Sequence, residues 1–416
     1  MSATKQLLLL KDFLRNAKKR LPLILESAST EKVSIVIGNQ SGDCDSIVSS
    51  ILHAYYLSHV RISSNAHSNM IFPVLSMPER DLALRGAESL LLKECGIEIS
   101  DLIFTDQIPW SNVSNMIDKV TLVDHNVLSD SMSFLGPFVE EIIDHHKDEG
   151  LYAKTVENRK RKIEMVGSTT TLIAENFLNN QFLNKTVFSG VGNSHDDGAQ
   201  LRDVDTDEHS NSRNISYMLF STILLDTMDL SPEAKKATKK DIDIVNYIQK
   251  YFGDFDRSKT FKKLHSAKFD PEFWLSLSTM DKLRLDYKQY SVTHTLGISA
   301  VLIPFRTFIE DDGFVDDCAA FMKKNSLQML VIMTMTLKEG NVPSREILVL
   351  SLKGCQDLFE KTISCIEDSN LQAEVQLEDI FSQLKFDYQN TNIKCYKQGL
   401  VTGSRKVVAP LLKNLL

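Results

Sequence analysis

Short apolar runs alternate with amphipathic segments along the first half of the chain. Segments 45–58 and 167–180 repeat apolar residues at helical spacing, and Gly167 and Ser168 mark the start of the second. We expect strands at five runs rich in β-branched and apolar residues: 32–38, 69–76, 101–106, 119–126 and 140–146. Strands that are apolar almost throughout and alternate with helices predict a largely parallel sheet that is buried on both faces.

The pattern changes in the middle of the chain. Residues 193–213 are polar and are expected to form a mobile loop, although their His and Asp residues also allow metal binding. Residues 216–230 return to an apolar helical pattern and close a first domain over 1–230. We expect a helical linker at 231–245 and a smaller α/β domain over 246–416. Its predicted strands are 295–303, 327–337 and 345–352.

Composition and charge narrow the class of protein. The net charge of −8 gives no hint of the basic domain that binds nucleic acid in nonspecific binders. No apolar run approaches the ~18 residues of a membrane span. The six cysteines are scattered without CxxC pairs, which is typical of reduced thiols in a cytoplasmic protein and offers no zinc site.

The basic, amphipathic residues 1–27 have two interpretations. They could be a mitochondrial transit peptide, and a mitochondrial pool is the alternative to a cytoplasmic location. Asp12, Glu26 and the presence of only two arginines favour a helix that docks on the first domain.

Acidic residues and histidines follow four of the apolar runs, and we expect each group to lie at the end of a strand. They are Asn39, Asp43 and Asp45 in the pattern N-x-x-x-D-x-D; Asp124 and His125; Asp144, His145 and His146; and Asp226 and Asp229. A single D-x-D is more often a helix cap, and a single histidine pair is commonly at the surface. Four such groups at the edge of one sheet would repel one another and lose hydration, which divalent cations would relieve. Carboxylates with a few imidazoles suit Mn²⁺ or Mg²⁺ and a two-metal site for phosphoryl transfer.

This ordered set, "GNQSGDCDS", "LVDHN", "IIDHH" and "LLDTMD", resembles the DHH phosphoesterase superfamily. The later segments "RLDYKQY" and "GSRK" are similar to the C-terminal domain shared by family II inorganic pyrophosphatases and yeast-type exopolyphosphatases. The resemblance runs from about residue 31 to about residue 410. It implies two α/β domains with the active site in the cleft between them.

The resemblance also implies roles for individual residues. Asp124 would bridge two divalent cations, Mn²⁺ or Mg²⁺ with Co²⁺ as a further option, and Asp144 would orient its neighbouring histidine. The implied metal ligands are Asp43, Asp45, Asp124, His145 and Asp226. The implied catalytic residues are Asn39, Asp124 and His146. The implied substrate-binding residues are His146, Lys288, Ser404 and Arg405, with Arg284 and Lys406 as weaker candidates.

Asn39 separates the branches of this superfamily. Family II pyrophosphatases have His at this position, whereas Asn resembles exopolyphosphatases and prune-type phosphodiesterases. The prune group typically has DHR where this chain has Asp144-His145-His146, and the GGGH segment of the nuclease branch does not occur. The resemblance therefore implies an exopolyphosphatase that releases orthophosphate from inorganic polyphosphate. The alternatives are a pyrophosphatase, a prune-like phosphodiesterase and a non-catalytic phosphate-binding module. We expect a monomer with no nucleic-acid or membrane partner.

Overall fold

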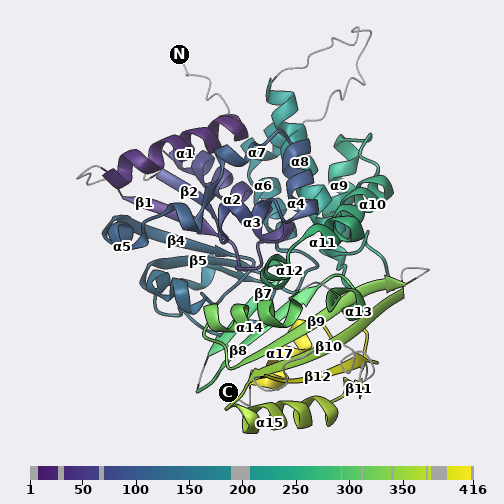
Figure 1. The fold of residues 1–416 in the computed structure, drawn as a ribbon. Helices are drawn as coiled ribbons and strands as arrows, with labels where there is room; N and C mark the ends of the chain where they lie inside the picture. Colours follow the sequence, from purple (N-terminus) through teal and green to yellow (C-terminus); the bar gives the residue numbers. More distant parts are fainter. Residues whose placement is uncertain are drawn as a thin grey trace, which may run out of the picture. The chain divides into compact units, whose positions relative to one another are not determined.

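The computed structural model describes residues 8–26, 32–64, 70–188, 207–291, 293–310, 313–338, 342–371, 373–375 and 391–413. The chain divides into two compact units, Met1–Lys268 and Phe269–Leu416. Each unit contains one six-stranded sheet (Figure 1). Among the described residues, no helix has the length and apolar character needed to cross a bilayer.

The sheet of the first unit is parallel throughout its described pairings, as the apolar runs predict. Its order is β3 (Ile103–Phe104), β2 (Met70–Leu75), β1 (Val33–Ile37), β4 (Ile117–Val123), β5 (Val139–Asp144) and β6 (Arg161–Ile163). Only β6 was not predicted, because its three residues are half-buried and carry little apolar signal.

The order of the strands reverses between β1 and β4. From β1 the chain continues to β2 and β3 on one side, and β4, β5 and β6 lie on the other side. Ile37 pairs with Leu122, so β1 and β4 end next to each other. The loops that leave two such strands diverge and open a crevice beyond their carboxyl ends, which is the usual ligand-binding position in open α/β sheets.

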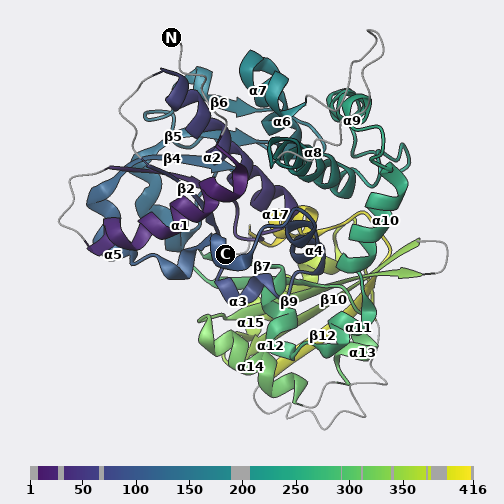
Figure 2. The same cartoon turned by 90° about the horizontal axis from the view of Figure 1, so that it is seen from above.

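Helices cover one face of this sheet, and a long 3₁₀ segment together with Ala17 and Leu21 of the N-terminal helix packs on the other. The face that includes Val36 and Ile143 packs against α2 (Cys44–Ser64), α4 (Gly86–Glu94), α6 (Thr169–Asn179) and α8 (Asp207–Asp226) (Figure 2). The face that includes Ile35 and Leu122 packs against η4 (Asp130–Phe138). Both faces are therefore buried, which explains why the strands are apolar almost throughout.

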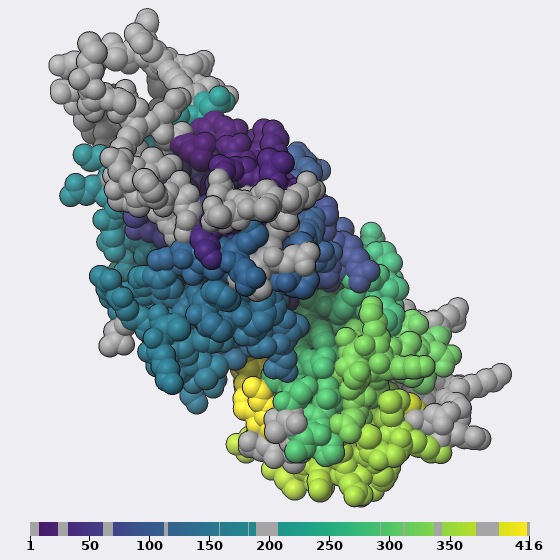
Figure 3. All heavy atoms as spheres, turned by 90° about the vertical axis from the view of Figure 1, so that its left-hand side faces the viewer, coloured from purple at the N-terminus to yellow at the C-terminus, as the bar shows by residue number. Residues whose placement is uncertain are grey.

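The N-terminal segment is a helix of the first unit, α1 (Leu10–Glu26). Phe13 and Leu14 are buried in the same cluster as α2 and α8, and Leu10 N–H donates to Asn211 Oδ1 at 2.7 Å. Figure 3 shows the purple atoms of the N-terminal region at the surface of this unit. The interpretation of this segment as a docked helix is confirmed.

Two predicted boundaries differ from the structure. Residues 207–213 form the start of α8 and not a loop, because Asn211 and Ser212 are buried with hydrogen-bond partners despite their polarity. The rest of the predicted loop, 193–206, lies outside the described residues. In the predicted linker, α9 (Lys239–Tyr251) buries Ile244 and Val245 in the first core, so the units divide later, after Lys268.

The second unit has a mixed sheet. Its order is β11 (Ala373–Val375), β12 (Thr391–Gln398), β10 (Val342–Leu352), β9 (Met329–Lys338), β8 (Thr295–Val301) and β7 (Tyr287–Ser291). Among the strands that the structure describes in this unit, only β8 and β9 pair in parallel. The three predicted strands correspond to β8, β9 and β10, whereas β7 and β12 are more polar and were not predicted. The helices of this unit are α11 (Pro271–Ser276), α12 (Thr279–Leu285), α13 (Phe305–Phe308), α14 (Phe314–Lys324), α15 (Gln356–Glu367) and α17 (Arg405–Lys413).

The first unit contains several further short helices. They are α3 (Glu79–Leu82), α5 (Trp110–Val113), α7 (Gln181–Val187), α10 (Arg257–Lys268), η1 (Ile99–Asp101), η2 (Thr105–Gln107), η3 (Ser114–Met116) and η5 (Asn158–Lys160).

Candidate metal centre

The loop after β1 places the amide of Asn39 against Asp124. Asn39 is buried, and its Nδ2 donates to the backbone oxygen of Asp124 at 3.1 Å and to Asp124 Oδ2 at 2.6 Å. Its Oδ1 accepts from Ser41 N–H at 2.8 Å. The side-chain oxygen thus faces its own loop, and Asn39 is a hydrogen-bond donor to the carboxylate after β4.

Asp43 and Asp45 lie on either side of Cys44, the first residue of α2, and have different surroundings. Asp43 is half-buried, and its Oδ1 accepts from Ser46 N–H at 3.2 Å, as a helix-capping carboxylate does. Asp45 is 3% exposed and points toward the start of α6. The helix-cap interpretation of the D-x-D pair therefore describes Asp43 and does not describe Asp45.

The start of α6 holds Asp45 in one orientation. Asp45 Oδ1 accepts from the hydroxyls of Ser168 and Thr170 at 2.8 and 2.7 Å and from Thr170 N–H at 2.8 Å. Asp45 Oδ2 accepts from Thr169 N–H at 2.7 Å. The first N–H groups of a helix have no partner within the helix, so a carboxylate is stabilised there. Asp45 Oδ2 then lies 3.9 Å from His145 Nε2.

Asp124 lies at the middle of the cluster. It follows β4 directly and has a φ of 61°, a left-handed conformation that Asp adopts more readily than most residues. Besides the Asn39 bond, its Oδ2 accepts from Ser46 Oγ at 2.7 Å. Its Oδ1 lies 3.5 Å from His145 Nε2 and 3.7 Å from His146 Nδ1. One oxygen is thus held by the first loop, and the other faces the histidines.

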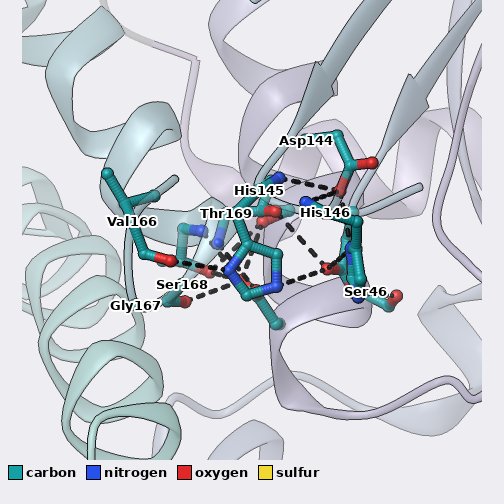
Figure 4. Close-up of polar contacts among 12 residues, drawn as sticks. Ser46, Asp144, His145, His146, Val166, Gly167, Ser168 and Thr169 are labelled. Atoms are coloured by element: carbon teal, nitrogen blue, oxygen red, sulfur yellow. Dashed lines mark hydrogen bonds and ion pairs between the residues drawn. The ribbon is translucent and has the colours of Figure 1, made fainter. Parts of the chain in front are cut away.

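The histidine after Asp144 has a defined tautomer. His145 Nδ1 lies 3.0 Å from the backbone oxygen of Val166 (Figure 4). Because a carbonyl oxygen can only accept, Nδ1 carries the proton, and in the neutral ring Nε2 carries the lone pair. This lone pair faces Asp124 and Asp45. A backbone acceptor behind the ring is the arrangement that metal-binding histidines usually have.

His146 is held by Asp144. Asp144 is fully buried, and its Oδ1 lies 2.8 Å from His146 Nδ1 and accepts from the backbone N–H groups of both histidines. Its Oδ2 accepts from Asn126 Nδ2 at 2.6 Å. Burial alone would raise the pKa of Asp144, but the hydrogen bonds and charge of His146 and the Asn126 bond hold it below its ordinary value. Asp144 is therefore an ionised carboxylate that orients the His146 ring.

Asp226 is the last residue of the helix α8. The prediction that each acidic group follows a strand is wrong here, because the apolar run before Asp226 is buried as a helix on the sheet. Asp226 interacts electrostatically with Asp45 and Asp43, and burial together with these charges raises its pKa well above the ordinary value. Its Oδ2 is buried without a hydrogen-bond partner among the described residues. Asp229 instead pairs with Arg257 at 2.8 Å.

The cluster fits divalent cations. Burial and the charges of Asp45 and Asp43 raise the pKa of Asp124 well above its ordinary value. Candidate ligand atoms of Asp124, His145 and His146 all lie within 4.8 Å of one another. Gathered carboxylates that resist ionisation, together with an oriented imidazole nitrogen, are stabilised by a bound cation. The structure thus contains a possible metal-binding group.

Asp241 supports this cluster and was missed by the sequence analysis. It is fully buried on α9; its Oδ2 accepts from Gly167 N–H at 2.9 Å, and its Oδ1 accepts from Thr171 Oγ1 at 2.6 Å. A side chain on Gly167 would overlap Thr227, since its Cβ would lie 2.4 Å from Thr227 Cγ2. The only sequence signal was the pattern T-x-x-D at the start of α9, which marks a helix cap and predicts no contact with α6.

The implied phosphate-binding residues of the second unit are partly brought together. Arg405, the first residue of α17, pairs with Asp286 at 2.6 Å, and Asp286 precedes Lys288 of β7 by two positions in the chain. Ser404 caps α17, and its backbone oxygen accepts from the N–H groups of residues 407 and 408. Arg284 instead pairs with Asp281 at 2.7 Å within its own helix. Lys406 is exposed.

Comparisons with known proteins agree with this architecture. Residues 33–191 match the DHH family, N-terminal domain, and residues 262–415 match the DHHA2 domain. The chain is 28% identical over 386 residues to "Exopolyphosphatase PRUNE1" of Homo sapiens, which covers 92% of this chain and 75% of that protein. It is 28% identical over 415 residues to the "Putative exopolyphosphatase" of Schizosaccharomyces pombe, which covers 97% of each.

The fold is also found among solved structures. The "Crystal structure of Methanococcus jannaschii putative family II inorganic pyrophosphatase" superimposes with a TM-score of 0.56 and 20% sequence identity. The match covers 92% of this chain and 99% of that chain. At this identity the match supports the fold. The two domain matches, together with the sequence relatives, confirm the family resemblance: the chain is a member of the DHH family, with an N-terminal DHH domain and a C-terminal DHHA2 domain.

Proposed function

We propose that this protein is a metal-dependent exopolyphosphatase that hydrolyses the terminal phosphoanhydride bond of linear inorganic polyphosphate. The observation that carries the proposal is the convergence of Asp45, Asp124 and the His145 Nε2 lone pair at the switch point of the parallel sheet. The names of the two sequence relatives support the choice of substrate.

In this proposal, five residues would hold two divalent cations, Mn²⁺ or Mg²⁺, and Asp124 would be a ligand shared by both. Those residues are Asp43, Asp45, Asp124, His145 and Asp226. Bound cations would supply the positive charge that neutralises phosphate oxygens and activates water. The protein's own contribution is orientation. The start of α6 fixes Asp45, Asn39 fixes Asp124, and Val166 fixes the tautomer of His145.

His146 contacts a phosphate group of the substrate. The ionised Asp144 behind its Nδ1 stabilises the protonated ring, so Nε2–H would donate to a phosphate oxygen as negative charge develops there. In the second unit, Lys288, Ser404 and Arg405 bind phosphate oxygens. The planar guanidinium of Arg405 matches two of them at once.

The test is phosphate release from pyrophosphate, tripolyphosphate and long polyphosphate, with Mn²⁺, with Mg²⁺ and after chelation. We expect release that is greatest with polyphosphate, lost with chelator and restored by Mn²⁺, Mg²⁺ or Co²⁺. Asp124→Asn should lose most activity while remaining folded, because no other carboxylate occupies its position.

The alternatives give different results in the same assay. A pyrophosphatase would prefer pyrophosphate, and a prune-like phosphodiesterase would cleave cyclic nucleotides. A phosphate-binding module would bind polyphosphate without releasing phosphate. Undiminished turnover by folded Asp124→Asn would contradict the metal centre itself.

A further inference from the structure

Arg85 lies beside the candidate metal centre and has no role in the mechanism above. It precedes α4 directly. A Cβ on Gly42 would lie 3.7 Å from Arg85 Cζ, so the guanidinium lies close to Gly42. Gly42 has a φ of +55° and is followed by Asp43. The loop that supplies the first carboxylate thus has a cation close to Gly42.

The polar partner of this guanidinium is a weak one. Arg85 Nε donates to the thioether sulfur of Met77 at 3.3 Å. No carboxylate in the part of the chain that the structure describes forms an ion pair with Arg85, although the side chain is half-buried. Arg161 and Arg405 are likewise half-buried but pair with Asp148 and Asp286. A thioether is a poor acceptor, so most of the Arg85 donors are available to a ligand.

A second cation, Lys268, lies near this loop. The end of α10 meets the start of α4, because a Cβ on Gly86 would lie 2.3 Å from the backbone oxygen of Ala267. The next residue, Lys268, interacts electrostatically with Glu88, Asp43 and Asp226. All of these residues belong to the first unit.

We propose that Arg85, with Lys268 near it, forms a subsite for a phosphate group other than the terminal one in a phosphoanhydride chain. The terminal phosphate must contact the groups around Asp124, whereas Arg85 contacts the Gly42 end of the loop. Arg binds two phosphate oxygens through its planar fork, which a point charge does not reproduce. This inference rests on the proposed function, which supplies the substrate. Arg85 is the residue that favours binding of a phosphate chain over binding of a single phosphate.

The experiment measures binding and turnover separately. Arg85→Ala, Arg85→Lys and the control Arg80→Ala are titrated by calorimetry with a non-hydrolysable bismethylene triphosphate, with orthophosphate and with Mn²⁺. Arg80 is a matched control, since its side chain is 68% exposed and lies near Asp81 at 3.6 Å. Tripolyphosphate hydrolysis is then followed for kcat and KM.

We expect Arg85→Ala to weaken binding of the triphosphate by about tenfold to a hundredfold, with a smaller loss for Arg85→Lys. Affinities for orthophosphate and Mn²⁺ should stay at the wild-type level, and KM should rise with little change in kcat because the contact is remote from the reacting phosphate. Lys268→Met should weaken triphosphate binding in the same direction. Arg80→Ala should match wild type throughout.

Two results would overturn the subsite. One is wild-type triphosphate affinity in Arg85→Ala, and the other is a parallel loss of Mn²⁺ and orthophosphate affinity, which would show that Arg85 only supports the loop. Failure of the proposed function would be seen separately, because the wild-type protein would then release no phosphate from polyphosphate. Selective loss of triphosphate binding in Arg85→Ala would still establish the subsite.

Discussion

Asn39 donates from Nδ2 to Asp124 Oδ2 at 2.6 Å. Asn39 is therefore a hydrogen-bond partner of Asp124, the carboxylate that we propose as a shared ligand of the cations. Asn39→Ala removes this donor, and we expect Mn²⁺ affinity to fall about tenfold to a hundredfold, as is typical when a group that orients a metal ligand is lost. Calorimetric Mn²⁺ titration of folded protein measures the effect.

Asn39→His tests the choice of substrate. An imidazole is a better ligand than an amide for transition metals, so we expect tighter Mn²⁺ binding and a higher ratio of pyrophosphate to polyphosphate hydrolysis. Metal titration and phosphate release from both substrates provide the readouts. If Mn²⁺ affinity rises while the ratio stays the same, Asn39 tunes only the metal. If neither changes, the position of Asn39 at the metal site is refuted.

Arg405 and Lys288 test the role of the second unit. Arg405→Ala and Lys288→Ala should each reduce kcat/KM for polyphosphate by about tenfold to a hundredfold, because each removes a charge-assisted contact with phosphate. Mn²⁺ affinity should not change, and the exposed Arg306→Ala serves as the control. Wild-type kinetics in both variants would exclude phosphate binding by these residues.

Asp241 tests the support of the metal centre. It accepts hydrogen bonds from Gly167, Thr171 and Thr238. Asp241→Asn replaces one accepting oxygen by an NH₂ group, which would face these hydrogen-bond donors. We expect a loss of about 2–3 kcal/mol in the free energy of unfolding, from urea denaturation, and a weaker Mn²⁺ affinity.

Asp243→Asn is the matched control for this change, because Asp243 is exposed and pairs only with Lys239 on the same helix among the described contacts. Asp243→Asn should lower the free energy of unfolding by at most about 0.5 kcal/mol. A destabilised Asp241→Asn with wild-type Mn²⁺ affinity would show that Asp241 supports the fold and leaves the metal ligands in place.

Glu141 predicts a pH dependence of stability. Its Oε2 lies 3.0 Å from His53 Nε2 and accepts from Thr121 Oγ1 at 3.1 Å. Burial would raise the pKa of Glu141, but His53 and Thr121 hold it below its ordinary value in the folded protein. The unfolded chain therefore takes up the proton first as the pH falls, so this contribution to stability is present above about pH 4.3 and is lost below it.

Glu141→Gln should accordingly flatten the dependence of the unfolding free energy on pH between about pH 3 and pH 6. Urea denaturation across this range, for wild type and variant, measures the slope. Equal slopes would mean that the Glu141 pKa is the same in the folded and unfolded chain.

The strands and their parallel arrangement were determined by local pattern. Apolar runs such as 32–38 and 140–146 form β1 and β5, because a strand that is buried on both faces must be apolar along its whole length. The carboxylates that follow β1 and β4, and the one that ends β5, were found for the same reason, since a charge next to a buried run needs a specific partner. The order of these motifs also sufficed to place the chain in its family.

Only the tertiary structure decided which groups meet. Asp241 contacts Gly167 across 74 positions of the chain, and Arg85 reaches Gly42 through the packing of α4, so neither contact leaves a local pattern in the sequence. The orientation of Asn39 and the tautomer of His145 likewise depend on Asp124 and Val166, which belong to other elements. Sequence pattern reports the periodicity and burial of each segment, whereas hydrogen-bond direction depends on neighbours that only the folded chain brings within 3 Å or so.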